Sequence, residues 1–394
     1  MLAHQVILLL FIGYLIFSID KKQKNFPVPV VLVLIGIGLS FIPYFDSLVI
    51  SKEIIFNVFL PTLLFTSAYS FSLPALKNNR WIIACLSTVG LIATASLLGL
   101  AIYMVSAPFI EISFLGALLV SAILTPTDPV SVVSILKNAS GKKNIANVVE
   151  GESMVNDGTS IVLFSVILTM YTRGESFSIG YFLSEFLTVS IGGIVLGIIF
   201  GWLLSRAVHY THHKQYQVML SIVVAYGSFY IAELMGVSGV LATVAAGIML
   251  SYEFGQTDKE EHFHTSLDGF WNIAKPSVLA LIFLLIGIDA ADYLAFPGWA
   301  LAFLIFLLSL IVRFVVLGTV TQAFPIWNKK FGLRDVSLIT WSGIKGTMSI
   351  ALLLSFEANA GNDNILISLT FAAVLLSLII QSAGIYPLTK RLEK

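Results

Sequence analysis

The sequence predicts an all-α polytopic membrane protein with about 13 transmembrane helices. Of its 394 residues, 57% are hydrophobic and only 11% are charged, whereas a soluble domain has roughly 25% charged residues. The apolar segments also run to about 20 residues each, the length that a helix needs to cross the hydrocarbon core of a bilayer. The solvent for most of this chain is therefore lipid.

The predicted spans follow one another along the whole chain. The first lacks the basic leading region and the small-residue cleavage site of a signal peptide, so we expect it to be retained. Spans eight and nine are separated only by Gly236 and Val237. Four glycines in span seven predict close helix packing. The thirteen segments are 2–19, 26–45, 54–73, 80–105, 109–136, 144–171, 179–207, 216–235, 237–254, 267–290, 297–324, 335–356 and 364–388.

The loops predict an orientation, because lysine and arginine favour the cytoplasmic side of a membrane. One alternate set of loops holds only Lys52 and Arg173. A miscounted span would destroy this asymmetry, so we expect the N-terminus outside and the C-terminus in the cytoplasm of a cell membrane. The opposite set holds Lys21, Lys22, Lys24, Lys77, Arg80, Lys137, Lys142, Lys143, Arg206, Lys214, Lys259, Lys329, Lys330, Arg334, Lys390, Arg391 and Lys394.

Composition and motifs exclude several classes of function. The net charge is zero, so nothing indicates nucleic-acid binding, and Cys85 is the only cysteine, so no internal disulfide exists. We find no phosphate-binding loop, nucleophile triad or Cys/His cluster, so we expect no enzyme activity, no cofactor and no use of ATP. The expected domain organisation is a single transmembrane domain over 1–394, without a cytoplasmic regulatory domain.

The informative residues are ionisable groups inside apolar spans. Such a group costs several kcal/mol unless it is paired or faces water, and it is a functional candidate by default. Five residues of this kind stand out: Asp128, Glu152, Asp157, Arg313 and Lys345.

Span five contains the sequence Thr-Pro-Thr-Asp-Pro at 125–129. Two prolines this close predict a broken helix, and irregular backbone at membrane depth is tolerated only against protein or a water-filled cavity. Secondary transporters bind their ions at such breaks. The alternative is a simple proline kink in which Asp128 caps the half-helix that follows it.

Span six contains Glu152, Ser153, Asn156 and Asp157. Residues four apart lie on one face of a helix, so Glu152 is stacked with Asn156 and Ser153 with Asp157. These hard oxygen ligands suit an alkali cation, and the same carboxylate is able to take a proton instead. A carboxylate that holds either ion, but not both, is the minimal chemistry of an exchanger. The alternative is a structural polar network, which fits Glu152 better than Asp157.

Two further charges lie in the second half of the chain. Arg313 is in the middle of span eleven with no acid nearby in sequence, so it needs a carboxylate from another span. Lys345 lies between Gly343 and Gly346 in span twelve, which predicts a second discontinuity. The two discontinuities are seven spans apart. This offset predicts two inverted six-helix repeats, about 1–172 and 216–390, joined by a connector helix at about 179–207, with their broken helices crossed.

Several motifs together resemble the NhaP-type sodium/proton antiporters, prokaryotic relatives of the NHE exchangers and members of the monovalent cation/proton antiporter family. The resemblance covers the whole chain. Its carriers are TPTDPVSVVSIL at 125–136, EGESMVNDGTSIVLF at 150–164, GVSGVLATVAAGIML at 236–250, LLIGID at 284–289, LIVRFVVLG at 310–318 and GIKGTMSIAL at 343–352.

The resemblance implies an NhaA/NhaP-like fold, a homodimer in lipid, and electroneutral exchange of one Na⁺ (or Li⁺) for one H⁺. It implies that Asp157 binds both ions and that Thr127 and Ser153 complete the Na⁺ site. Asn156 would be held by Glu152, which pairs with Arg313. Asp128 and Lys345 would lie where the broken helices cross, facing the helix N-termini and C-termini respectively.

Two departures from the family pattern bear on these expectations. Lys345 stands where the family usually has arginine, so the charge is kept but the planar fork is lost. Thr66 stands where the family often has an acid, which leaves a K⁺/H⁺ antiporter as an alternative for the same site. A cation channel or a sensor is the alternative from a different class.

Overall fold

The chain is helical throughout the part that the structure describes. The structure is a computed structural model that describes residues 3–19, 28–45, 48, 51–128, 132–133, 136–137, 143–174, 178–207, 214–254, 261–294, 296–360 and 364–392. No strand occurs within these ranges, and each of the predicted apolar segments contains a helix. In the described part of the chain, seven helices are long and apolar enough to cross a membrane, and shorter apolar helices accompany them. The predicted fold class is confirmed.

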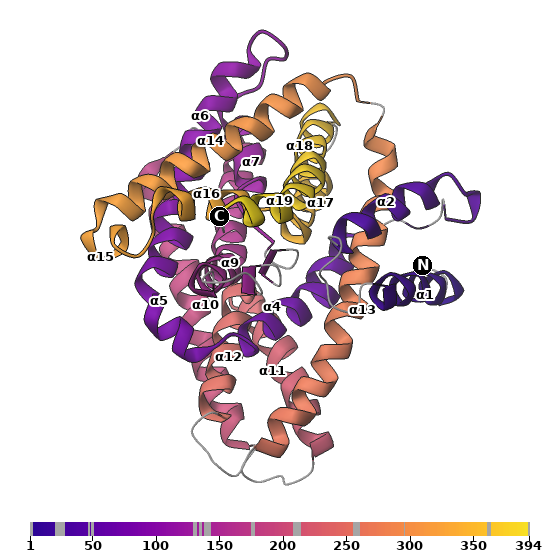
Figure 1. Cartoon of the computed structure of the whole chain (residues 1–394), viewed down its shortest axis with the longest axis vertical. Helices are drawn as coiled ribbons and strands as arrows, with labels where there is room; N and C mark the ends of the chain where they lie inside the picture. The colour runs from indigo at the N-terminus through magenta and orange to yellow at the C-terminus, as the bar shows by residue number, and fades with distance from the viewer. Residues whose placement is uncertain are drawn as a thin grey trace. The chain divides into compact units, whose positions relative to one another are not determined.

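The helices, which are labelled in Figure 1, fall into two compact units, each assembled from separate stretches of chain. The first unit comprises Met1–Lys52, Asn79–Phe177 and Ala280–Lys394, and the second comprises Glu53–Asn78 and Ser178–Leu279. The second unit thus contains the third, seventh, eighth and ninth predicted spans and the beginning of the tenth. The ionisable residues identified from the sequence all lie in the first unit.

The first unit is built around long helices interrupted at defined places. Within it α7 packs against α6 and α9, and α14 packs against α6, α16 and α18. Helix α7 begins after Ser113, whose hydroxyl accepts a hydrogen bond from the backbone N–H of Gly116 at 3.0 Å. Its elements are α1 (Ala3–Ile19), α2 (Val28–Ser40), η1 (Pro43–Phe45), most of α5 (Leu73–Cys85), η3 (Leu86–Gly90), α6 (Leu91–Ser106), α7 (Phe114–Ile123), α9 (Lys143–Arg173), the second part of α13 (Glu261–Leu294), α14 (Trp299–Ala323), α15 (Pro325–Asn328), α16 (Leu333–Trp341), α17 (Thr347–Ala360), α18 (Asn364–Leu376), η5 (Ser377–Gln381) and α19 (Ser382–Leu392).

The second unit packs α10 (Ile179–Ala207) closely against α12 (Gly239–Phe254). A Cβ added at Gly197 would lie 2.8 Å from the Cα of Ala242, so the backbones approach too closely for a side chain. The close packing predicted from the span-seven glycines is therefore present. The other elements are α3 (Lys52–Ile54), η2 (Ile55–Phe59), α4 (Leu60–Tyr69), α11 (Lys214–Leu234) and the first part of α13 (Glu261–Leu294).

The short joint predicted between spans eight and nine is a tight turn. Helix α11 ends at Leu234 and α12 begins at Gly239. Between them Gly236 has φ of +72°, a left-handed conformation that glycine adopts without steric cost. The turn therefore separates two helices that would otherwise read as one apolar run.

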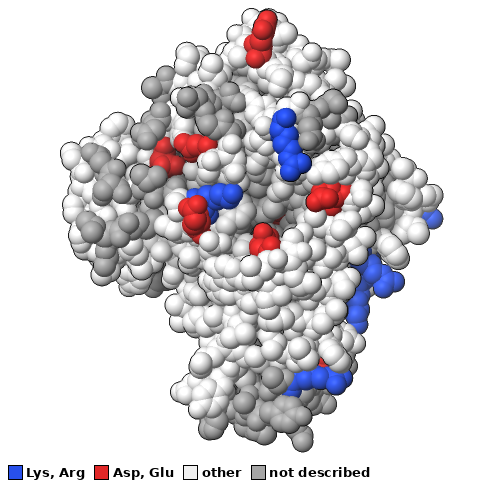
Figure 2. All heavy atoms as spheres, turned by 180° about the vertical axis from the view of Figure 1, so that it is seen from behind, with Lys and Arg blue, Asp and Glu red and all other residues white. Residues whose placement is uncertain are grey.

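The surface agrees with a lipid environment. Charged side chains are sparse on the face shown in Figure 2, where most of the area belongs to other residues. Helix α10 exposes large apolar side chains, including Ile191 at 55% and Ile199 at 58%. An exposed apolar surface of this kind needs a partner in water but is satisfied by lipid tails.

Candidate ion site at the crossing of two broken helices

The first break follows α7. The helix ends at Ile123, Leu124 forms a turn, and residues 125–128 have no helical structure. Thr125 donates its hydroxyl back to the carbonyl of Ser121 at 2.6 Å, which satisfies one carbonyl that the break would leave without a partner. Pro126 removes one backbone N–H from the segment. Pro129, the second proline of the motif, lies outside the described residues.

The second break separates α16 from α17. Helix α16 ends at Trp341, Ser342 forms a turn, and 343–346 are irregular before α17 begins at Thr347. The discontinuity predicted from Gly343 and Gly346 is therefore present.

The two broken segments touch each other at Asp128. Its backbone N–H donates to the carbonyl of Ile344 at 2.7 Å. Its carboxylate Oδ2 accepts from the backbone N–H and the hydroxyl of Thr347, each at 3.4 Å. The carboxylate thus lies at the N-terminus of α17, where the helix dipole favours negative charge. Asp128, from the first broken segment, therefore caps α17, the helix that follows the second break.

Gly346 makes this crossing possible. A Cβ added to it would lie 2.8 Å from the Cγ of Asp128. Lys345 lies in the same irregular segment and is 4% exposed, and its backbone N–H donates to the hydroxyl of Ser377 at 3.0 Å. Both charged residues expected at the crossing are therefore there.

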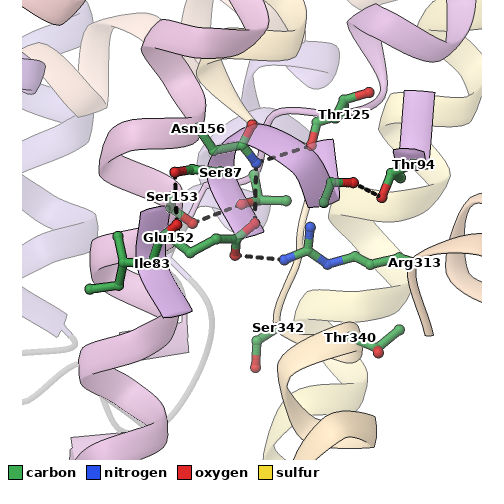
Figure 3. A network of polar contacts seen from close by, with 12 residues as sticks. Ile83, Ser87, Thr94, Thr125, Glu152, Ser153, Asn156, Arg313, Thr340 and Ser342 are labelled. Carbon is green, nitrogen blue, oxygen red and sulfur yellow. Dashed lines mark hydrogen bonds and ion pairs between the residues drawn. The ribbon is translucent and has the colours of Figure 1, made fainter. Parts of the chain in front are cut away.

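Helix α9 carries a row of polar side chains, Glu152, Ser153, Asn156 and Asp157, which we call the polar wall. Figure 3 shows the first three of them. The hydroxyls of Ser153 and Thr127 share a hydrogen bond at 2.7 Å. The amide of Asn156 donates to Glu152 Oε1 at 3.3 Å and to the carbonyl of Thr125 at 3.4 Å. These contacts connect α9 to the first broken segment at both of its threonines.

A buried ion pair closes the network. Arg313 Nη2 donates to Glu152 Oε2 at 2.7 Å, and the two side chains are 7% and 3% exposed. The partner that the sequence required for Arg313 is thus Glu152, as the resemblance implied. Gly343 leaves room for the guanidinium, since a Cβ added there would lie 2.5 Å from Arg313 Nε and 2.9 Å from Cζ.

Asp157 differs from its neighbours. Its Oδ1 is buried and has no hydrogen-bond partner among the described residues. It lies one helical turn after Ser153 on α9, so it shares the face that Thr127 contacts. A buried carboxylate oxygen without a protein donor has unused capacity for a cation or a proton.

The structure also brings in residues that the sequence reading did not select. Ser377 and Gln381 of η5 contact the second break. Ser87 in the π-helical turn η3 offers its carbonyl to the hydroxyl of Thr159 at 2.7 Å. The sequence could have indicated Gln381, because a glutamine four residues after a serine inside an apolar span needs hydrogen-bond partners.

Two broken helices that cross beside a carboxylate with one buried oxygen unpaired among the described residues, inside an apolar helical bundle, define a secondary ion transporter. The chain belongs to the sodium/hydrogen exchanger family, whose transmembrane profile matches residues 7–391.

Curated relatives and a solved structure agree with this assignment. The chain is 32% identical over 349 residues to the Na(+)/H(+) antiporter NhaP of Pseudomonas aeruginosa, covering 86% of this chain and 81% of the relative. It is 30% identical over 400 residues to the Na(+)/H(+) antiporter NhaH of Halobacillus aidingensis, covering 98% and 97%. The structure of the sodium proton antiporter MjNhaP1 from Methanocaldococcus jannaschii at pH 8 superposes with a TM-score of 0.78 over 99% of this chain and 98% of that one. At 20% identity this likeness shows the fold.

Proposed function

We propose that this multi-pass membrane protein is an antiporter that exchanges Na⁺ (or Li⁺) for H⁺ by alternating access, with the two ions competing for Asp157. The observation that carries the site assignment is the buried Oδ1 of Asp157 on α9, which has no hydrogen-bond partner in the part of the chain that the structure describes. Every other carboxylate of the wall and the crossing has a protein partner: Glu152 has Arg313 and Asn156, and Asp128 has Thr347.

The hydroxyls of Thr127 and Ser153 are the proposed companions of Asp157 in the cation site. They hydrogen-bond to each other across the break at 2.7 Å, so each presents an oxygen with a spare lone pair. Hydroxyl and carboxylate oxygens are hard ligands, which suit an alkali cation. The cation is the transported substrate.

The remaining polar residues hold this arrangement. Asn156 ties α9 to the Glu152–Arg313 pair and to the backbone of Thr125. Asp128 faces the N-terminus of α17, and the positive charge of Lys345 compensates the C-terminal ends of the half-helices. Asp157 is then the carboxylate that alternates between binding a cation and binding a proton. One cation is therefore exchanged for one proton, and transport is electroneutral.

The larger arrangement is proposed on the same basis. We expect inverted repeats at about 1–172 and 216–390 with the connector at about 179–207, a homodimer, and a location in the cell membrane with the C-terminus in the cytoplasm. The loop charges support the orientation, and the crossing of two interrupted spans supports the repeats.

The test of the site is Asp157→Asn in proteoliposomes. We expect it to abolish the pH change that sodium evokes, because an amide carries neither the negative charge nor the exchangeable proton. The matched control is Asp268→Asn, which removes an exposed carboxylate on α13 and should leave the rate unchanged. Normal exchange by Asp157→Asn would show that another group binds the ions.

The same liposomes separate the alternatives. Replacing sodium by potassium tests the K⁺/H⁺ antiporter, an alternative that remains because Thr66 stands where the family often has an acid. A current measurement under voltage clamp distinguishes a channel, since an electroneutral exchanger carries almost no current while a channel conducts far above carrier rates.

Competition at one carboxylate predicts how the rate depends on pH. At low pH a proton occupies Asp157 and opposes cation binding, and at high pH the proton half of the cycle lacks its substrate. The exchange rate should therefore pass through a maximum, and adding sodium should move the acidic limb toward lower pH. A rate that stays flat over several pH units would indicate separate sites for the two ions.

A further inference from the structure

Two polar residues of η5 contact the second break from a helix that the proposed ion site does not use. Ser377 and Gln381 are 1% and 0% exposed. They are the first and last residues of η5, a π-helical turn between α18 and α19. π-Helical turns inside α-helices are rare, and those that occur are often found at functional sites.

Gln381 holds the end of α16. Its side-chain amide donates to the backbone carbonyl of Trp341 at 2.8 Å. The backbone carbonyl of Gln381 in turn accepts from the indole N–H of Trp341 at 2.9 Å. Trp341 is the last residue of α16, so this reciprocal pair satisfies a carbonyl that the break deprives of its helical partner.

Ser377 holds the other side of the break. Its hydroxyl accepts from the backbone N–H of Lys345 at 3.0 Å and also hydrogen-bonds Gln381 Oε1. Trp341, which ends α16, and Lys345, within the irregular segment, are thereby joined through two side chains that touch each other. We call Ser377, Gln381 and Trp341 the η5 clasp.

The clasp connects to the ion site through the backbone. The residue before Lys345 is Ile344, whose carbonyl accepts from the N–H of Asp128. Asp128 follows Thr127, whose hydroxyl contacts Ser153. A change in the position of Lys345 is therefore transmitted to a proposed cation ligand through one hydrogen bond and two short stretches of chain.

We propose that the η5 clasp is a positioning device that sets the geometry of the second break, and through it the affinity of the cation site. This role rests on the proposed exchange function. Ser377 and Gln381 do not touch the ion. They act through Lys345 and Asp128, as outer-shell partners orient the ligands of a metal site.

The first test needs no transport. Amide hydrogen exchange of the 342–347 peptide in purified protein should be about tenfold faster in Ser377→Ala, which removes the acceptor of the Lys345 N–H. It should also be faster in Gln381→Met, which frees the carbonyl of Trp341 at the start of the break and removes the acceptor that orients Ser377. The matched control is Ser382→Ala. Ser382 is the next residue and is 1% exposed, and its hydroxyl has no hydrogen-bond partner among the described residues. Its removal should leave the exchange rate unchanged.

The second test uses proteoliposomes. Ser377→Ala and Gln381→Met should raise the half-maximal sodium concentration by about tenfold and move the acidic limb of the pH profile toward higher pH, with a smaller change in maximal rate. Loss of packing alone would instead lower the maximal rate and leave both the half-maximal concentration and the pH profile in place.

The outcomes are distinct. Unchanged hydrogen exchange in both variants, or an equal change in Ser382→Ala, overturns the clasp. Faster hydrogen exchange with an unchanged sodium dependence and pH profile overturns its positioning role. A wild-type protein that exchanges no cation for protons overturns the proposed function, and the hydrogen-exchange comparison still decides whether the clasp exists.

Discussion

At the scale of single residues, the Glu152–Arg313 pair makes the sharpest energetic prediction. Both side chains are almost completely buried and lie 2.7 Å apart. Removing one partner strands the other charge, which costs about 3–5 kcal/mol. Glu152→Leu or Arg313→Met alone should therefore lower the thermal unfolding midpoint strongly.

The double variant separates stability from function. Replacing both charges by apolar side chains removes the stranded group, so most of the lost stability should return. Transport should stay impaired, because Asn156 has lost its acceptor on Glu152. A thermal-shift cycle of the four proteins measures the coupling, and additive losses in the double variant would contradict a direct pair.

Gly343 offers a second prediction at this scale. An alanine there would place its Cβ 2.5 Å from Arg313 Nε, and overpacking of this kind costs about 1–3 kcal/mol. Gly343→Ala should lower the thermal midpoint and reduce transport. Gly318→Ala is the control on the same helix as Arg313, since nothing lies within 4 Å of its added Cβ. Equal stability of the two variants would argue against the close contact.

At the scale of elements, the two helix breaks could be predicted from the sequence, but the contacts that the broken segments make could not. Prolines and glycines at 125–129 and 343–346 are local signals, so both discontinuities were predictable. The partner of Arg313 in α9 was predictable only through the family resemblance, because nothing local encodes a contact between residues far apart in the chain. That Asp128 caps α17 through Thr347 also depends on the crossing.

The π-helical turns were not predictable, and the reason is physical. Ser377–Gln381 and Leu86–Gly90 lie within continuous helices of apolar spans, and the amphipathic pattern that reveals an α-helix hardly changes when one turn widens. Their consequence is visible only in three dimensions, where Ser377 and Gln381 meet the break in span twelve. Two polar residues four apart in an apolar span, such as Ser377 and Gln381, therefore predict hydrogen-bond partners on another helix.

At the scale of the molecule, the division into two units was also hidden from the sequence. Each unit is assembled from separate stretches, and boundaries between them fall inside helices, between Asn78 and Asn79 in α5 and between Leu279 and Ala280 in α13. The apolar pattern of a helix does not reveal such a boundary, because the residues before and after it are equally apolar and suited to lipid. The loop charges, in contrast, sum over the whole chain and predict an orientation that single residues cannot.

This orientation can be tested because the chain has a single cysteine. After Cys85→Ser, a cysteine is introduced at Arg173 or at Lys330, both exposed at helix ends. The predicted thirteen spans place these two positions on opposite sides of the membrane, with Lys330 in the cytoplasm. In intact cells a membrane-impermeant maleimide should label Arg173→Cys at once and Lys330→Cys only after permeabilisation. The Cys85→Ser background, which should remain unlabelled, is the control. Labelling of both positions from outside would require an even number of spans between them where the prediction has five, and the reverse pattern would invert the protein in the membrane.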